Sequence, residues 1–191
     1  LLGVCDQMYL FEPGDDTTVC VLKAVKPKKV KLFTGPPSHK EDDAKVVHEL
    51  MNNADIRIVS GGTTSQIVAR ELGVEVKSST EIYDKEVPPI AYIQGVDLVT
   101  EGVLTLSKTI DRLKSLSKSL DSDIFKAKDG ASQMAKLLYS ASHIKLLVGR
   151  SLNIANAESS FQRDLELRLH VVGELEKILV KLGKIVTVEY Y

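Results

Sequence analysis

The chain has 191 residues, of which 43% are hydrophobic, so it is long enough to bury one substantial core. Its 25 basic residues nearly balance its 26 acidic residues, which excludes a strong overall field for nucleic acid or an anionic membrane. No apolar run approaches the ~20 residues that span a bilayer, and the N-terminus lacks the order of a signal peptide. We therefore expect a cytoplasmic protein that binds neither nucleic acid nor membrane.

The cysteines and histidines offer no obvious site. Cys5 and Cys20 form no CxxC pattern, and the four histidines have no metal-ligand spacing, so we expect two reduced thiols. The sequence opens at Leu1 without a methionine and closes on a strand-like run, which suggests the C-terminal portion of a longer protein.

The first 29 residues read as a short unit followed by a junction. Residues 1–10 have the pattern of a helix end, a turn follows, and residues 17–25 form a β-type run. Residues 26–29 are basic and contain a proline, as a domain junction does. We therefore expect two units, residues 1–25 and residues 30–191.

Beyond the junction, short β-branched runs alternate with helical patterns, which predicts βαβ units and a largely parallel sheet flanked by helices, a Rossmann-like α/β fold. The expected strands are residues 30–34, 56–60, 74–77, 90–93 or 98–99, 144–148 and 185–188. The expected helices begin at a capping box at residues 38–41, after residues 61–64, at residue 104, after residues 129–132, and near residue 165.

Four loops follow apolar strands and contain glycine. They are Thr34-Gly35-Pro36-Pro37, Gly61-Gly62-Thr63-Thr64, Thr100-Glu101-Gly102 and Gly149-Arg150-Ser151-Leu152-Asn153. In a parallel sheet the carboxyl ends of the strands share one edge, so these loops should gather there and form a ligand site.

The loop at residues 61–64 is the most informative of the four. Its glycines permit close backbone approach, and the following helix turns its unpaired N–H groups and positive dipole end toward the loop, which suits an anion. Thr63 and Thr64 add hydroxyls, Arg150 can clamp phosphate or carboxylate, and Glu101 can accept from a hydroxyl or an amine. The alternatives are a plain structural turn capped by Thr63, and a surface salt bridge for Arg150.

The segment Gly14-Asp15-Asp16-Thr17-Thr18-Val19-Cys20-Val21-Leu22 resembles the closing segment of the protein phosphatase 2C superfamily, in particular the branch of stage II sporulation protein E. The glycine-containing loops above, with Asp97 to Gly102 and Asp129-Gly130-Ala131-Ser132, resemble landmarks of the C-terminal extension found in sporulation-type phosphatases of anaerobic bacteria. The resemblance departs at residues 153–160, where the family carries a more polar run.

This resemblance implies that residues 1–25 are the terminal helix and strand of a serine/threonine phosphatase core. Asp15 matches the family's last metal-binding aspartate. The complete phosphatase would use Mn²⁺ or Mg²⁺, but one carboxylate pair cannot fix a two-metal centre, so we expect no cofactor and no phosphatase activity in this chain alone.

Three functions follow. The first is a C-terminal accessory or regulatory domain that contacts its own phosphatase catalytic domain and binds a small anionic ligand through Gly61, Gly62, Thr63, Thr64, Glu101, Arg150 and Asn153. The second is a free-standing small-molecule enzyme, with Glu101 as general base and Arg150 as substrate clamp. The third is a module that docks onto the catalytic domain or forms a homodimer.

Overall fold

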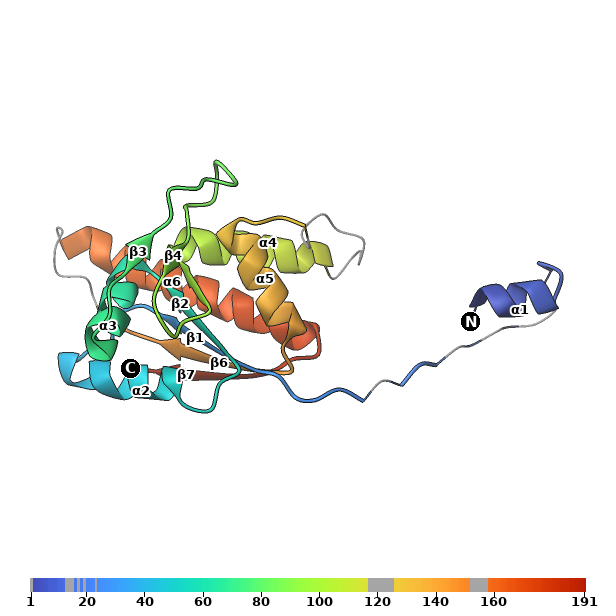
Figure 1. The fold of residues 1–191 in the computed structure, drawn as a ribbon, viewed down its shortest axis with the longest axis horizontal. Helices are drawn as coiled ribbons and strands as arrows, with labels where there is room; N and C mark the ends of the chain where they lie inside the picture. Colours follow the sequence, from blue (N-terminus) through green and yellow to red (C-terminus); the bar gives the residue numbers. More distant parts are fainter. Residues whose placement is uncertain are drawn as a thin grey trace.

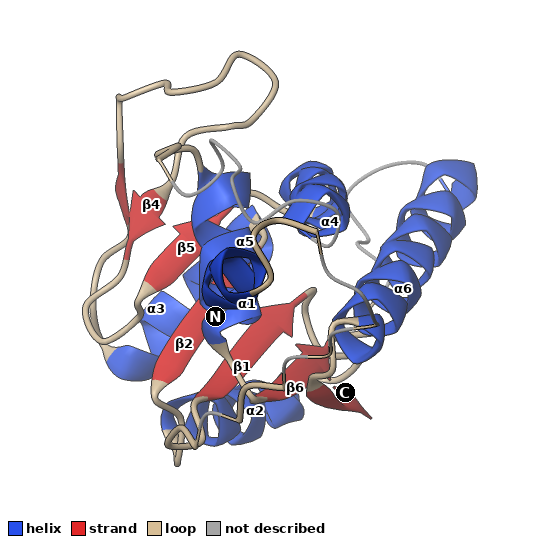
Figure 2. Ribbon diagram, turned by 90° about the vertical axis from the view of Figure 1, so that its right-hand side faces the viewer, coloured by secondary structure: helices blue, strands red, loops and turns tan. Residues whose placement is uncertain are grey.

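The computed structural model describes residues 2–12, 16, 18, 20–22, 24–116, 126–151 and 158–191. A seven-stranded sheet forms the centre of the molecule, with helices on both faces (Figures 1 and 2). The strands are β1 (Lys29–Thr34), β2 (Ile56–Ser60), β3 (Lys77–Ser78), β4 (Ala91–Tyr92), β5 (Leu98–Thr100), β6 (His143–Val148) and β7 (Ile185–Tyr190). The predicted α/β class is confirmed.

The sheet order is β3-β4-β5-β2-β1-β6-β7. The strands β5, β2, β1, β6 and β7 run parallel, whereas β4 pairs antiparallel with both β5 and β3 at one edge. Among the parallel strands, β1 lies in the middle and the chain winds outward from it in both directions. This is the order of a doubly wound α/β sheet, and it creates a switch point between β1 and β6.

Two helices cover one face of the sheet, namely α2 (Asp43–Met51) and α3 (Gly62–Leu72), with a 3-10 turn η1 (Lys40–Asp42) before α2. The other face carries α4 (Val103–Leu116), α5 (Gly130–Ser140) and α6 (Glu158–Lys181). Alternate strand residues supply the two cores: Leu32 and Leu146 pack under α4 to α6, and Phe33 and Leu147 pack under α2 and α3. Because β1 and β6 are buried on both faces, apolar residues occupy adjacent positions in them, as at Leu32-Phe33 and Leu146-Leu147-Val148.

The helix ends follow the expected local chemistry. Gly73 ends α3 in the left-handed conformation, with φ 67°, and its N–H donates to the carbonyls of Ala69 and Arg70. At the start of α5, the Asp129 side chain accepts from the backbone N–H of Ser132.

None of the helices in the described residues is long and apolar enough to cross a membrane.

Three local predictions are wrong. The strand expected at residues 74–77 is instead β3, a two-residue edge strand that begins at Lys77. The capping box at residues 38–41 does not form, because both the N–H and the hydroxyl of Ser38 donate to the main-chain oxygen of Tyr191, 3.2 Å away. A tertiary contact has replaced the local cap.

The third error concerns residues 17–25, whose described members form no strand. A lone β-type run has no neighbouring strand to accept its hydrogen bonds, so its propensity is not enough to make it a strand. The helix before it, α1 (Leu2–Met8), contains no buried residue and lies apart from the body in Figure 1. Apolar side chains in this part of the chain are consequently exposed, with Leu10 at 83% and Leu22 at 93%.

A network of charged side chains fastens α2 to the sheet. The Lys31 ammonium donates to the Glu49 carboxylate at 2.7 Å and to the carbonyls of Glu49 and Asn52, at the carboxyl end of α2. The Lys145 ammonium lies 2.8 Å from the same carboxylate and 2.5 Å from Glu189 on β7. Hydrogen bonds from Lys145 and then Lys31 lower the pKa of Glu49 below its ordinary value of 4.5.

A carboxyl group whose pKa is lowered by folding stabilises the native state above its unfolded pKa, and that contribution is lost as the pH falls through the lower folded pKa. We expect Glu49→Gln to reduce the free energy of unfolding by about 1 kcal/mol at pH 7, since the pair is partly exposed. The difference from the unchanged protein should shrink as the pH falls below about 4.5. Urea unfolding at several pH values measures both.

The matched control is Glu174→Gln, because Glu174 pairs with Lys177 on the exposed side of α6. It should leave urea unfolding unchanged at pH 7. A Glu49→Gln protein that unfolds at the same urea concentration as the unchanged protein would show that the network does not hold α2.

Candidate functional site

The switch point of the sheet lies between the neighbouring strands β1 and β6. After β1 the chain turns to α2 on one face, and after β6 it turns to α6 on the other (Figure 2). The two loops diverge at the carboxyl edge of the sheet. In doubly wound folds, ligands bind in the crevice that this divergence opens.

The two loops touch each other through their backbones before they diverge. Gly149 donates its N–H to the carbonyl of Thr34 at 2.9 Å, and Ser151 donates to that of Pro36 at 3.0 Å. A Cβ atom on Gly149 would lie 2.1 Å from the oxygen of Pro36, so no side chain fits there. Gly35 has φ 78°, and a Cβ atom on it would lie 2.8 Å from the oxygen of Gly149. Glycine is therefore required at both positions.

Tyr191, the residue after β7, reinforces this contact. The main-chain oxygen of Tyr191 accepts from the N–H of Ser38, after β1, and from the N–H of Arg150, after β6, at 2.9 Å. The N–H of Tyr191 donates to the carbonyl of Val148 at 2.9 Å. Both loops thus donate to one main-chain oxygen, that of Tyr191, at the end of the sheet.

A cleft of about 370 Å³ opens beside this contact. It is lined by the ends of β1, β2 and β5, by the first turns of α3 and α4, and by one face of α6. The lining residues are Thr34, Gly35, Pro36, Ser60, Gly61, Gly62, Thr63, Thr64, Glu101, Gly102, Val103, Asp164, Leu167 and Arg168. Its volume is within the range of small-ligand sites.

The amino end of α3 forms one wall of the cleft. Gly61 precedes the helix with φ 121°, and its N–H donates to the carbonyl of Thr100 at 2.9 Å, which fixes the turn against β5. The helix begins at Gly62, so the N–H groups of Gly62, Thr63 and Thr64 belong to the first turn and have no acceptor within the helix. They provide donors and a positive dipole end at the cleft.

Arg168 of α6 provides the opposite wall. Its Nη1 donates to the carbonyl of Gly149 at 3.3 Å and would lie 2.6 Å from a Cβ atom on Gly35. Among the described residues, this carbonyl is the one hydrogen-bond partner found for its guanidinium. Burial lowers the pKa of Arg168, while the charge of Asp164 acts in the opposite direction. A desolvated guanidinium that remains charged attracts an anion more strongly than one in water does.

Glu101 lies at the rim, after β5. Its carbonyl accepts from the hydroxyls of Ser60 at 2.8 Å and Thr100 at 2.9 Å, and its carboxylate accepts from the N–H of Gly102 at the start of α4. The carboxylate therefore has a structural partner in this conformation. Together with Asp164 of α6 it adds acceptors for hydroxyl or amine groups to a cleft that also carries donors from α3 and Arg168.

The structure brings together the predicted residues Gly61, Gly62, Thr63, Thr64 and Glu101 at this cleft. It does not bring Arg150 to the cleft. The guanidinium of Arg150 lies over the ring of Tyr190, 5.8 Å from the ring centre, on the outer strand β7. Asn153 and Asp15 lie outside the described residues.

Arg168 was not anticipated, although the sequence contains a signal for it. Residues 168, 172, 175 and 179 have helical spacing, and Val172, Leu175 and Leu179 are buried. A single arginine on an otherwise apolar helix face indicates a charge directed toward the interior.

The described residues contain no group of three or more histidine, cysteine, aspartate or glutamate side chains placed to hold a metal ion. Asp15 is not among the described residues. The donor set that can be described suits an anion and its hydroxyl groups rather than a metal ion.

Comparisons with protein-family models, with curated proteins and with solved structures found no match for this chain.

The contact between the loops can be tested by adding a single methyl group. Gly149→Ala would place a Cβ atom against the carbonyls of Gly35 and Pro36, and we expect it to lower the free energy of unfolding by about 3 kcal/mol or more. Chemical denaturation of purified protein measures the loss.

Gly62→Ala is the matched control, since nothing lies within 4 Å of its Cβ position and its φ is not positive. At this helical position alanine should leave stability unchanged or raise it by about 0.5 kcal/mol. Equal stability of the two variants would contradict the described contact.

Proposed function

We propose that residues 29–191 form an accessory domain that binds a small phosphorylated or carboxylated ligand in the cleft, and that it regulates a sporulation-type serine/threonine phosphatase domain of the same protein in the cytoplasm. The observation that carries the ligand proposal is the position of the Arg168 guanidinium, half-buried at the switch point across from the amino end of α3. The link to a phosphatase rests on the sequence resemblance alone.

Two features favour a phosphorylated metabolite with hydroxyl groups. The N–H groups of α3's first turn and the fork of Arg168 are donors suited to phosphate oxygens. Glu101 and Asp164 are acceptors on the same cleft and suit the hydroxyls of a sugar or ribose. Inorganic phosphate would contact only the donors of α3 and Arg168 and would leave the acceptors Glu101 and Asp164 unused. We therefore expect sugar phosphates and nucleotides to bind more tightly than phosphate.

The N-terminal segment supports attachment to another domain. Its described apolar residues are exposed, Leu10 and Leu22 most of all, and they pack on nothing in the body. In the proposed protein they complete the core of the phosphatase domain, whose Mn²⁺ or Mg²⁺ would be held by several aspartates. This chain supplies Asp15 toward that set, so no catalytic step is assigned to it.

The ligand proposal predicts that a panel of phosphorylated metabolites raises the thermal unfolding temperature of the full chain, because a ligand that binds only the native state stabilises it. Arg168→Gln should abolish the rise, whereas Arg168→Lys should retain part of it, since lysine keeps the charge without the fork. Differential scanning fluorimetry measures these shifts.

Arg150→Gln is the matched control, because Arg150 is outside the cleft and its amide contact to Tyr191 does not need the side chain. It should bind as the unchanged protein does. No shift with any member of the panel, or equal shifts in Arg168→Gln and the unchanged protein, would leave the cleft without the proposed role.

The attachment proposal predicts that Leu10→Asp and Leu22→Asp leave the body unaffected. Because these side chains have no partner in the body, the thermal unfolding temperature and its response to ligand should not change. Self-association, measured by light scattering, should fall because the exposed apolar surface is reduced. A lower unfolding temperature would instead make residues 1–25 an integral part of the body.

A further inference from the structure

The strand β7 forms one edge of the sheet, and among the described residues no strand pairs with its outer side (Figure 1). On its inner side, Tyr191 donates its N–H to the carbonyl of Val148 at 2.9 Å, and Ile185 donates to that of Ser142 at 3.0 Å. In a parallel pair, alternate residues of a strand bond to the same neighbour, so the odd-numbered residues of β7 face β6. The backbone groups of the even-numbered residues face outward, and these residues are Val186, Val188 and Tyr190.

The outer side of β7 has unpaired backbone groups and apolar side chains. Within the described residues, the N–H groups and carbonyls of Val186, Val188 and Tyr190 have no hydrogen-bond partner. Val186 and Val188 are half-buried against the core under α6, whereas Tyr190 is 52% exposed and Ile185 58%. An edge strand of this kind readily accepts another strand.

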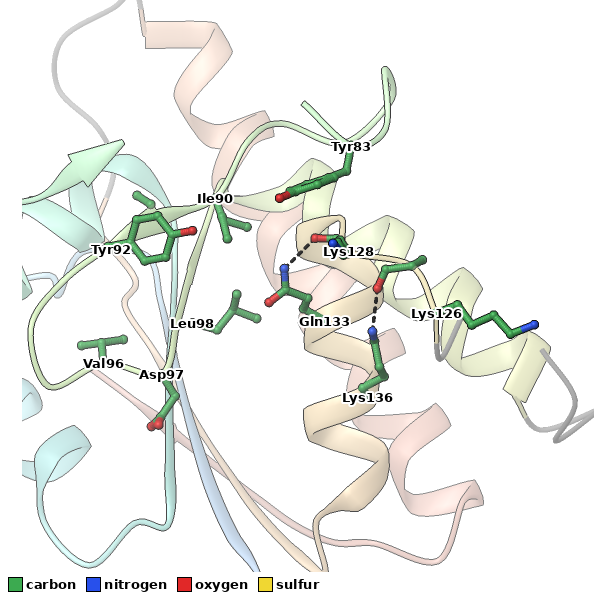
Figure 3. Close-up of a pocket in the computed structure, with 12 residues that line it drawn as sticks. Tyr83, Ile90, Tyr92, Val96, Asp97, Leu98, Lys126, Lys128, Gln133 and Lys136 are labelled. Carbon is green, nitrogen blue, oxygen red and sulfur yellow. Dashed lines mark hydrogen bonds between the residues drawn. The ribbon is translucent and has the colours of Figure 1, made fainter. Parts of the chain in front are cut away.

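The opposite edge of the sheet is protected from such pairing. Its last strand, β3, has two residues, and residues 79–90 leave the sheet directly after it. An ion pair between Glu86 and Lys108 fastens this segment to α4. Figure 3 shows Tyr83 of the segment and Tyr92 of β4 around a pocket beside β5. A short edge strand with a long segment held beside it offers few positions to a second strand.

The strand β7 has neither protection. It has six residues without proline, and the one charged residue among them is Glu189. The carboxylate of Glu189 lies 2.5 Å from the Lys145 ammonium and accepts from the Tyr191 hydroxyl at 2.8 Å. Its charge is therefore engaged within its own chain, and it does not guard the edge as a free charged side chain would.

A second copy of β7 fits this edge in the antiparallel direction, about a two-fold axis at Val188. Val188 then faces its own copy, and Val186 faces Tyr190 of the second copy. Each of these is a hydrogen-bonded pair that exchanges two bonds, so the pairing uses every outward N–H and carbonyl of β7. On the α6 side it places valine against valine and valine against tyrosine, which are favourable cross-strand pairs.

The neighbouring registers fit less well. With the axis at Glu189, two carboxylates would lie directly opposite each other, which is destabilising. With the axis at Thr187, Tyr190 would face Lys184, whose N–H is already donated to a carbonyl of α6. With the axis at Val188, Glu189 instead faces Thr187, which is uncharged. The sequence of β7 is therefore complementary to itself in one register.

We propose that two copies of this chain associate through β7, antiparallel about Val188, and join their sheets into one continuous sheet. A second copy is the occupant because its backbone groups, apolar side chains and charges all match the edge in the same register. None of the residues of β7 lines the cleft, so the contact leaves the cleft open. The inference does not depend on the proposed ligand.

The first experiment measures association of the full chain that carries Leu10→Asp and Leu22→Asp, so that self-association through the exposed N-terminal segment is removed. Sedimentation velocity should show a monomer that converts to a dimer as the protein concentration rises. A protein that stays monomeric at every concentration would overturn the proposal.

The charge pairing tests the register in the same background. The Thr187 side chain is exposed, and Thr187→Glu would place a carboxylate opposite Glu189 of the second copy, twice in the symmetric dimer. We expect it to weaken association by at least about tenfold, whereas Thr187→Lys should not weaken it. The matched control is Ser78→Glu, an exposed position on β3 at the other edge, which should associate as the background does. Equal association of Thr187→Glu and the background would contradict the pairing.

Hydrogen exchange followed by NMR identifies the occupant of the edge. The amides of Val186, Val188 and Tyr190 should become protected as the protein concentration rises, because their partners belong to the second copy. The amides of Thr187 and Glu189 should be protected at every concentration, since they bond to β6. Protection of the three outward amides that does not change with concentration would place another segment of the same chain on the edge, and the proposal would fail.

Discussion

The contact between the backbones of Gly35 and Gly149 is the constraint on which the rest of the structure depends. It lets the loops after β1 and β6 meet at the centre of the sheet before they part to opposite faces, and no side chain can enter there. Arg168 packs against this glycine pair and gains its one described hydrogen bond from it. The Arg168 guanidinium can therefore reach the cleft because residues 35 and 149 are both glycine.

The two edges of the sheet differ in how their charged groups are satisfied. At the amino edge, Lys31, Lys145 and Glu49 hold the carboxyl end of α2 with charge pairs that satisfy one another. At the carboxyl edge, the first N–H groups of α3 have no acceptor within the helix, and among the described residues the guanidinium of Arg168 has one hydrogen-bond partner, the carbonyl of Gly149. The sheet tolerates these donors at its carboxyl edge because it is buried on both faces and is held by ion pairs at its amino edge.

The central fold could be predicted from the sequence because β1, β2 and β6 are rich in β-branched residues and leucine, and each is followed by glycine at the edge. The cleft residues Gly61 to Thr64 and Glu101 came from the same reasoning. What failed depends on distant partners: Ser38 bonds to Tyr191, which lies 153 positions away, and β3 exists only through its pairing with β4. Arg168 lies on a helix that the sequence predicts, but helical spacing alone does not show which loops that face of the helix meets at the carboxyl edge.

The most direct test of the account is residue-resolved NMR of the full chain titrated with a nucleoside monophosphate. We predict saturable shifts at the amides of Gly62, Thr63 and Thr64 and at the guanidinium of Arg168, with the amides of Gly35 and Gly149 following as the loops respond. The side chain of Arg150 should not shift. Shifts at Arg150 without Arg168, or none at the first turn of α3, would contradict a ligand site at the switch point.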